Sequence, residues 1–172
     1  MVRERLTGTL ARLRVAPITR AQVLAGKGLA CWVAVATLMT LLIAFGAAIF
    51  HVRIASIPML AAAIACTACC FTGLMMLLSV GGRSISTVSG MGWGANVLMA
   101  MLGGGMIPLA FMPPWMRTLS HVSPVKWGIL SLEGAIWRDF SPIEMLPACG
   151  VLLAVGSISF LLGARIFARQ EG

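Results

Sequence analysis

Few residues in this sequence could carry chemistry, and the closest grouping is the cysteine run Cys66, Cys69 and Cys70. The C-x-x-C-C spacing would suit a metal ion if histidine or carboxylate ligands stood nearby. The surrounding letters AAAIACTACCFTG contain no such residue. We therefore favour small thiols packed between helices over a membrane enzyme built on the cysteines. All five cysteines fall in apolar segments, so no disulfide framework is expected.

Histidines and carboxylates are too few and too scattered for acid–base or nucleophilic catalysis. The chain has two histidines and five acidic residues. It contains no H-E-x-x-H, no G-x-S-x-G and no pair of neighbouring carboxylates. The run Gly81-Gly82-Arg83-Ser84 lacks the spacing of a phosphate-binding P-loop. We expect no catalytic, cofactor or metal site, and hence no enzyme.

Composition assigns the chain to the membrane proteins. Hydrophobic residues make up 59% of the sequence and charged residues 10%, whereas a soluble domain carries about 25% charged residues. The net charge of +8 is concentrated at the ends of apolar segments. Positive charge at membrane edges is a topology signal and argues against nucleic acid as a partner.

Four apolar segments are long enough to cross a bilayer, which takes roughly 20 helical residues. We predict an all-α polytopic membrane protein with transmembrane helices at 28–50, 57–80, 91–111 and 146–167. Three glycines at 103–105, followed by Pro108, weaken the third helix near its end. Broken backbone at membrane depth needs shielding by protein or by a water-filled cavity. We therefore expect a kinked or partly re-entrant segment there.

Small residues recur every four positions along the second predicted span. They are Ala61, Ala65, Cys69 and Gly73. Such a stripe lets two helix backbones approach closely. It is compatible with packing inside the chain and with a dimer interface.

The segment 112–145 is too interrupted to be a span. Four prolines divide it, and three tryptophans alternate with charged residues. Tryptophan prefers the level of the lipid headgroups, so we predict two short interfacial helices, Pro114 to His121 and Pro124 to Trp137. The tryptophans are expected to be anchors rather than substrate binders. Glu133 could face inward, although Lys126 or Arg138 could neutralise it.

The first twenty residues, MVRERLTGTLARLRVAPITR, form a basic amphipathic helix in this reading. Leu6, Leu10 and Leu13 share one face, and Pro17 ends the pattern. Such a helix can anchor to anionic lipid, dock a partner protein, or mark the cytoplasmic side.

Charge counting predicts the orientation. With four spans, nine Lys or Arg residues lie on the side of both termini and four on the other. The positive-inside rule then places both termini in the cytoplasm of a multi-pass inner-membrane protein. The tryptophan-rich segment would face outward.

Ionisable residues are nearly absent from the centres of the predicted spans. Ion-coupled pumps need intramembrane acids or histidines, so this class is disfavoured. If the protein moves a substrate uphill, its energy must come from a partner. The amphipathic helix is the natural contact for such a partner.

Two ordered segments carry a resemblance to a known family. The segment ERLTGTLARLRVAPITR, Glu4 to Arg20, resembles the E-R-x-x-G-T-L-x-R-L-x-x-x-P-[ILM]-[ST]-R segment of ABC-2 type transporter permeases. The outer segment is similar to the part of that family where a G-x-x-[FI]-P motif and a hydrophobic-Pro-x-W helix precede an [NST]-P-x-x-[YW] helix. The matching residues are GMIP at 105–108, FMP with Trp115, and SPVKW at 123–127.

The resemblance implies the membrane half of an ATP-driven exporter, covering residues 1–172 as one permease domain. Its partners would be a cytosolic ABC ATPase, a second permease half and membrane lipid, and its substrates hydrophobic or amphipathic. The residues implied in ATPase coupling are Glu4, Arg5, Leu6, Gly8, Thr9, Leu10, Arg12, Leu13 and Pro17. Those implied in an outer gate are Gly105, Pro108, Phe111, Pro113, Trp115, Pro124, Trp127 and Glu133.

The number of spans differs from the family pattern. Family members usually have six spans in each half, and this chain corresponds to the coupling segment and the last four. Three readings stay open: a truncated gene product, a start assigned too far downstream, and one piece of a split permease. The alternative is a membrane scaffold or permease remnant that does not transport, whose basic helix binds lipid.

Overall fold

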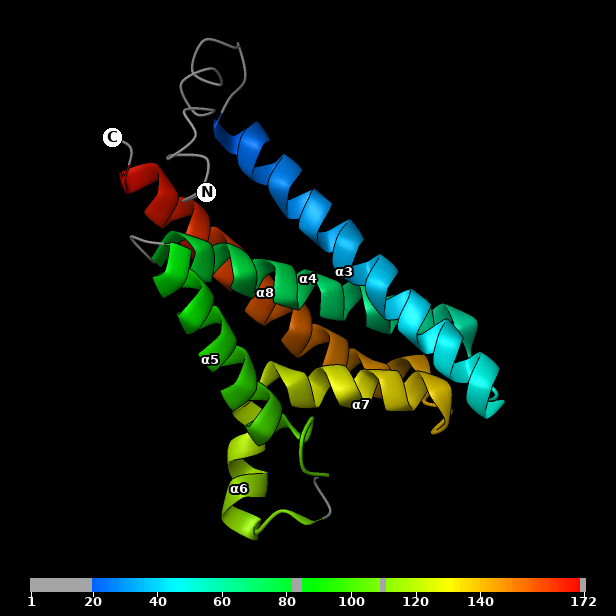
Figure 1. Ribbon diagram of the computed structural model, residues 1–172. Coiled ribbons are helices and arrows are strands. Elements are labelled where there is room, and N and C mark those ends of the chain that lie inside the picture. The colour runs from blue at the N-terminus through cyan, green and yellow to red at the C-terminus, as the bar shows by residue number, and fades with distance from the viewer. Residues whose placement is uncertain (1–19, 82–84, 109–110, 171–172) are drawn as a thin grey trace.

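The computed structural model describes residues 20–81, 85–108 and 111–170, and this part of the chain folds as helices joined by loops (Figure 1). The all-α prediction is confirmed. The elements in chain order are α3 (Arg20–Phe50), α4 (Ile57–Gly81), α5 (Ile85–Gly103), α6 (Pro114–Leu119), the 3₁₀ turn η2 (Ser120–Val122), α7 (Pro124–Ile136) and α8 (Pro142–Gln170).

Three of the described helices are long and apolar enough to cross a membrane. Their candidate spans are Gln22–Phe50, Ile57–Val80 and Pro142–Ile166. The second span agrees with the prediction of 57–80. The first candidate span begins earlier than the predicted 28, and the one in α8 earlier than the predicted 146, because α3 already includes Lys27 and α8 starts at Pro142.

The start of α8 explains the second of these differences. Ser141 and Glu144 form a capping box: the Ser141 N–H donates to Glu144 Oε2 at 2.8 Å, and the Glu144 N–H lies 3.4 Å from Ser141 Oγ. Pro142 occupies the first helical position, where its missing N–H costs nothing. Proline therefore starts α8, whereas the sequence reading took it as the end of a short piece.

The predicted span at 91–111 is wrong in its bounds. The helix in this region, α5, is 19 residues long, begins at Ile85 and ends at Gly103. Gly104 has a φ of 92°, and the Gly105 N–H turns back to the carbonyl of Ala100 at 2.8 Å. A residue other than glycine is strained at such a φ, so the glycine run ends the helix there. α5 is not among the three candidate spans of the described residues.

α4 and α8 pack against each other and run parallel. Leu60 and Met145 share one apolar cluster near the start of both helices. Further along, Gly73 faces the backbone of Gly156, and a Cβ built on Gly163 would lie 3.2 Å from the Cα of Leu77. Because α4 and α8 run in the same direction, the chain that joins them must lead from the C-terminal end of α4 back to the level of its N-terminal end.

The small-residue stripe of α4 takes part in this packing. A Cβ on Gly156 would lie 2.7 Å from the Cα of Cys70 and 2.8 Å from the carbonyl oxygen of Cys69. Cys70 is fully buried. Packing within the chain, one of the two readings of the stripe, is thus confirmed for its second half, and these two cysteines act as small residues at a helix contact.

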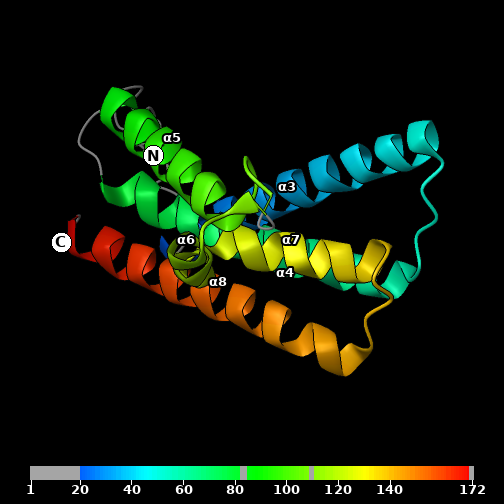
Figure 2. The same ribbon diagram turned by 90° about the horizontal axis from the view of Figure 1, so that it is seen from below.

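Two helices share the return from the end of α4 to the start of α8. α5 leads away from the end of α4, and α7 continues to the opposite end (Figures 1 and 2). A Cβ on Gly103, the last residue of α5, would lie 2.6 Å from the Cβ of Val125 near the start of α7. The third crossing, predicted from the sequence as one helix at 91–111, is therefore discontinuous: α5 and α7 share it, and α6 and η2 are inserted at the break.

Candidate functional site

The predicted ATPase-coupling residues lie outside the described part of the chain. They are Glu4, Arg5, Leu6, Gly8, Thr9, Leu10, Arg12, Leu13 and Pro17. The segment leads directly into α3. Leu24 in the second turn of α3 packs with Met76, Val80 and Phe160, which lie towards the C-terminal ends of α4 and α8.

The predicted outer segment folds as two short helices, as expected, although their ends differ slightly from the prediction. α6 and η2 cover 114–122, and α7 ends at Ile136. Pro114 and Pro124 each occupy the first turn of their helix. The fixed φ of proline suits this position, so the prolines that interrupt the sequence also start its helices.

The junction of α5 with α7 is tightly packed. The Ser123 hydroxyl donates to the carbonyl of Met99 at 2.7 Å. A Cβ on Gly103 would lie 2.8 Å from Ser123 Oγ and 2.8 Å from the backbone nitrogen of Lys126. No side chain fits between the two helices here, so glycine is required for their approach.

The position of α7 along α4 is fixed at two points. Gly128 faces Thr67, with 3.4 Å between a built Cβ and the threonine methyl. The Ser56 N–H, just before α4, donates to the carbonyl of Ala135 at 3.2 Å. α7 therefore runs antiparallel to the first half of α4 and begins close to the middle of that helix. α5 and α7 thus form one crossing that is broken near the middle of α4, and the break follows the glycine run at 103–105 where the sequence predicted a kinked or partly re-entrant segment.

The predicted gate residues are divided between the connecting loop and α7. Those on the loop and α6 are solvent-exposed, with Phe111 and Trp115 exposed by 81% and 64%. Pro124 is buried at the start of α7. Trp127 is half-buried, and its indole N–H donates to the carbonyl of His121 at 2.9 Å. The remaining predicted residues are Gly105, Pro108 and Pro113, all exposed before α6.

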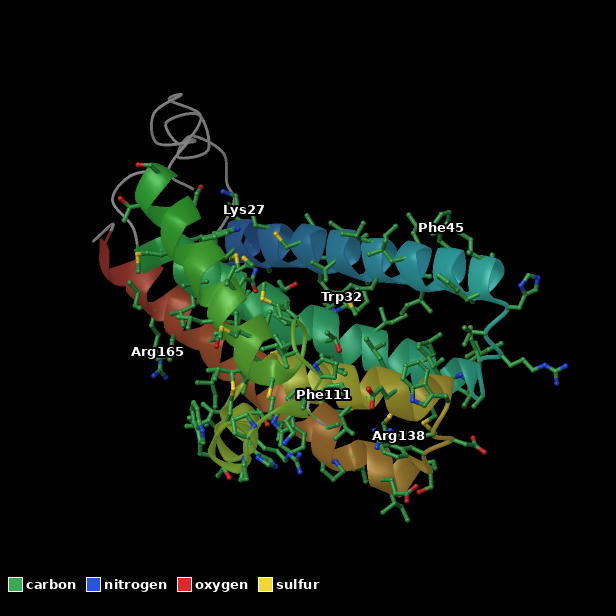
Figure 3. All side chains as sticks on the ribbon, turned by 60° about the horizontal axis from the view of Figure 1, so that its bottom comes forward. Lys27, Trp32, Phe45, Phe111, Arg138 and Arg165 are labelled. Atoms are coloured by element: carbon green, nitrogen blue, oxygen red, sulfur yellow. The ribbon has the colours of Figure 1, made fainter. Side chains whose placement is uncertain are left out.

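Glu133 lies at the far end of α7 from this group. Its carboxylate forms an ion pair with Arg138 at 2.8 Å. Arg138 is therefore the neutralising partner, one of the two candidates named from the sequence. Figure 3 shows Arg138 towards one end of the helices, with Lys27 and Arg165 towards the other. The Glu133 carbonyl accepts a hydrogen bond from the backbone N–H of Trp137 at 3.1 Å.

A cluster of basic side chains, missed in the sequence reading, lies at the break between α5 and α7. Lys126 Nζ is 2.8 Å from His121 Nε2, and 6.0 Å from the ring centroid of Trp127. Arg117 is close enough to affect Lys126 electrostatically. The signal in the sequence is the run of basic residues in 117–126, which the prediction places in interfacial helices at the lipid headgroups.

A second feature absent from the sequence reading is a cavity of about 520 Å³ against α3, α4 and α8. Its wall includes Trp32, whose indole N–H donates to the carbonyl of Ala65 at 3.2 Å (Figure 3). The other lining residues are small or apolar: Ala25, Gly28, Leu29, Cys69, Thr72, Gly73, Gly156, Ser157, Phe160 and Leu161. The cavity offers apolar contact and no charge.

Metal-ligating side chains do not gather in groups of three anywhere in residues 20–81, 85–108 and 111–170. Within the same ranges the cysteines are free thiols.

Comparison with protein families decides the class of the protein. The family model described as ABC-2 type transporter matches residues 1–137. The match begins at the amphipathic segment, continues through α3, α4 and α5, and ends just after α7. The chain belongs to the ABC-2 type transporter family. The search of curated proteins found no match, and neither did the search of solved structures.

Membership of the ABC-2 family makes the chain a transmembrane component of an ABC transporter rather than its ATPase. The three candidate spans agree with a membrane location. α6 and α7 are thus part of an ABC-2 membrane domain, and α8 follows the matched range.

Proposed function

We propose that this chain is the transmembrane subunit of an ATP-driven exporter and forms part of the path for a hydrophobic or amphipathic substrate. The family match over residues 1–137 carries the proposal. ATP hydrolysis takes place on a separate cytosolic ATPase. A second permease half, from another copy or another chain, completes the path.

The distribution of charge supports an external energy source. In the three candidate spans the described charged side chains are Lys27, Glu144 and Arg165. Each lies within two turns of a span end. A proton- or sodium-coupled transporter would carry ionisable groups in the middle of its spans.

The amphipathic segment is the proposed contact with the ATPase. Leu6, Leu10 and Leu13 form its apolar face, and Gly8 allows close approach. The charged residues Glu4, Arg5 and Arg12 would fix its register. We place this segment and both termini on the cytoplasmic side of an inner membrane, with the C-terminal end of α7 on the outer side.

Purification of the tagged chain from its native membrane in mild detergent tests the proposal. We expect a P-loop ATPase to co-purify and to be lost when Gly8→Trp and Leu10→Asp are combined. Arg53→Gln, a change in the exposed α3–α4 loop, is the control and should leave recovery of the ATPase unchanged. Recovery of the folded chain alone would refute the proposal and favour a scaffold protein that does not transport.

A further inference from the structure

The break between α5 and α7 places charged groups at an unusual depth. Gly128 faces Thr67, the eleventh residue of the 25-residue helix α4. Lys126 precedes Gly128 by two residues, so it lies beside the middle of α4. If α4 spans the bilayer, this is close to the midplane. A charge there is costly unless it meets water or an opposite charge, and such residues mark ligand or ion pathways.

Both ring nitrogens of His121 have hydrogen-bond partners. Nδ1 lies 3.2 Å from the carbonyl oxygen of Thr118, which can only accept. Nε2 lies 2.8 Å from Lys126 Nζ. The imidazole thus orients the lysine.

The positive charges of this cluster have no anionic partner among the described residues. Glu133, which is paired with Arg138, lies seven residues or about two turns further along α7. Lys126 has further hydrogen-bonding capacity, because an ammonium group carries three protons. Arg117 presents a guanidinium on the exposed side of α6. Lysine with arginine is a pairing suited to phosphate oxygens.

Large apolar side chains surround the cluster on its own segment. Phe111, Trp115, Leu119 and Val122 are exposed by 81%, 64%, 48% and 82%. A cationic centre within an apolar rim complements a molecule with an anionic head and a hydrocarbon body. Discontinuous helices near the midplane form substrate sites in other transporters, because the break leaves polar groups available.

We propose that Arg117, His121 and Lys126 form a binding site for the phosphate head of an anionic amphipath, on the substrate path of the transporter. This proposal rests on the proposed function and narrows its substrate class. Lys126 and Arg117 bind the phosphate oxygens, and His121 orients Lys126. The exposed side chains of α6 and η2 contact the hydrocarbon body.

Binding to the intact chain in phosphatidylcholine nanodiscs tests the proposal, with a short-chain fluorescent phosphatidic acid as the probe. We expect Lys126→Gln to weaken binding about 10-fold or more, and Arg117→Gln by about 3- to 10-fold, because each removes a charge-assisted hydrogen bond. Lys126→Arg should retain most of the affinity. Arg53→Gln, a matched loss of an exposed arginine elsewhere, should change affinity by less than about twofold.

Two further arms identify what the site binds. A fluorescent phosphatidylcholine of the same chain length should bind much more weakly than phosphatidic acid, and inorganic phosphate should compete poorly. Competition by inorganic phosphate at a similar concentration would assign the site to free phosphate and overturn the amphipath. Equal binding of both lipids, or equal losses in Lys126→Gln and Arg53→Gln, would overturn the site itself.

The assay needs no ATPase, so its failure is distinct from failure of the proposed function. If an ATPase co-purifies but Lys126→Gln binds phosphatidic acid normally, the anion site is refuted and the exporter role stands. If the anion preference depends on Lys126 but no ATPase is recovered, the exporter role is refuted and the lipid site stands. Arg117 is exposed in α6, so its variant remains informative if the Lys126 variant does not fold.

Discussion

At the scale of single residues, glycines decide which helices touch. Gly73 and Gly156 bring the backbones of α4 and α8 together where no side chain fits. Gly150, two turns earlier in α8, has open space where its Cβ would be. The same residue type thus has different roles in one helix, and only the structure distinguishes them.

The first prediction follows from this pair. Gly156→Ala should destabilise the protein by about 1–3 kcal/mol, because the new methyl would meet the backbone of Cys69 and Cys70. Gly150→Ala should be neutral or stabilising by up to about 1 kcal/mol, because alanine favours the helix. Thermal unfolding in detergent, followed by circular dichroism, measures both. Equal destabilisation by the two changes would contradict the assignment of Gly156 to a helix contact.

At the scale of elements, the broken crossing of α5 and α7 is the feature that most affects function. The helix stop at Gly103 and the turn at Gly104 end α5 early, and Pro124 starts α7 after the inserted α6. Backbone breaks at such a depth need shielding by protein or water. The inserted α6 and η2 and the basic cluster of Arg117, His121 and Lys126 all lie at this break.

The second prediction concerns the junction at this break. Gly103→Ala should separate α5 from α7, because its Cβ would lie within 3 Å of Val125, Lys126 and Ser123. We expect a loss of stability of about 1–3 kcal/mol and faster labelling of a cysteine placed at Thr118. Gly94→Ala, on the same helix with open space around it, is the control. Labelling that is equally fast in both variants would argue against a tight α5–α7 junction.

The sequence predicted elements better than it predicted their contacts. The second span, the two short helices and the weakness at 103–105 could all be read from apolar runs, prolines and glycines. The broken crossing between α4 and α8 could not be read from the sequence, because two separate helices, α5 and α7, share it. The decisive contact joins Gly103 with Val125. Lys126 and His121 were missed for the same reason: they meet only because η2 turns the chain between them.

At the scale of the whole molecule, α4 links contacts at the two ends of the helical domain. Leu24 of α3 packs on Met76 and Val80 of α4, next to the segment proposed to bind the ATPase. The other end of α4 is tied to α7 through the hydrogen bond from Ser56 to Ala135. α4 therefore contacts the start of α3 at one end and the end of α7 at the other.

Labelling of a Thr118→Cys variant in inside-out vesicles from the native membrane tests whether the ATPase is coupled to α6. The five native cysteines are replaced, and a membrane-permeant maleimide reports exposure of α6. We predict that ATP with Mg²⁺, supplied at the cytoplasmic face, changes the labelling rate by about threefold or more, since closure of the ATPase shifts the population of gate conformations. Adding Gly8→Trp should abolish the change. A labelling rate that is the same with and without ATP would contradict coupling between the ATPase and α6.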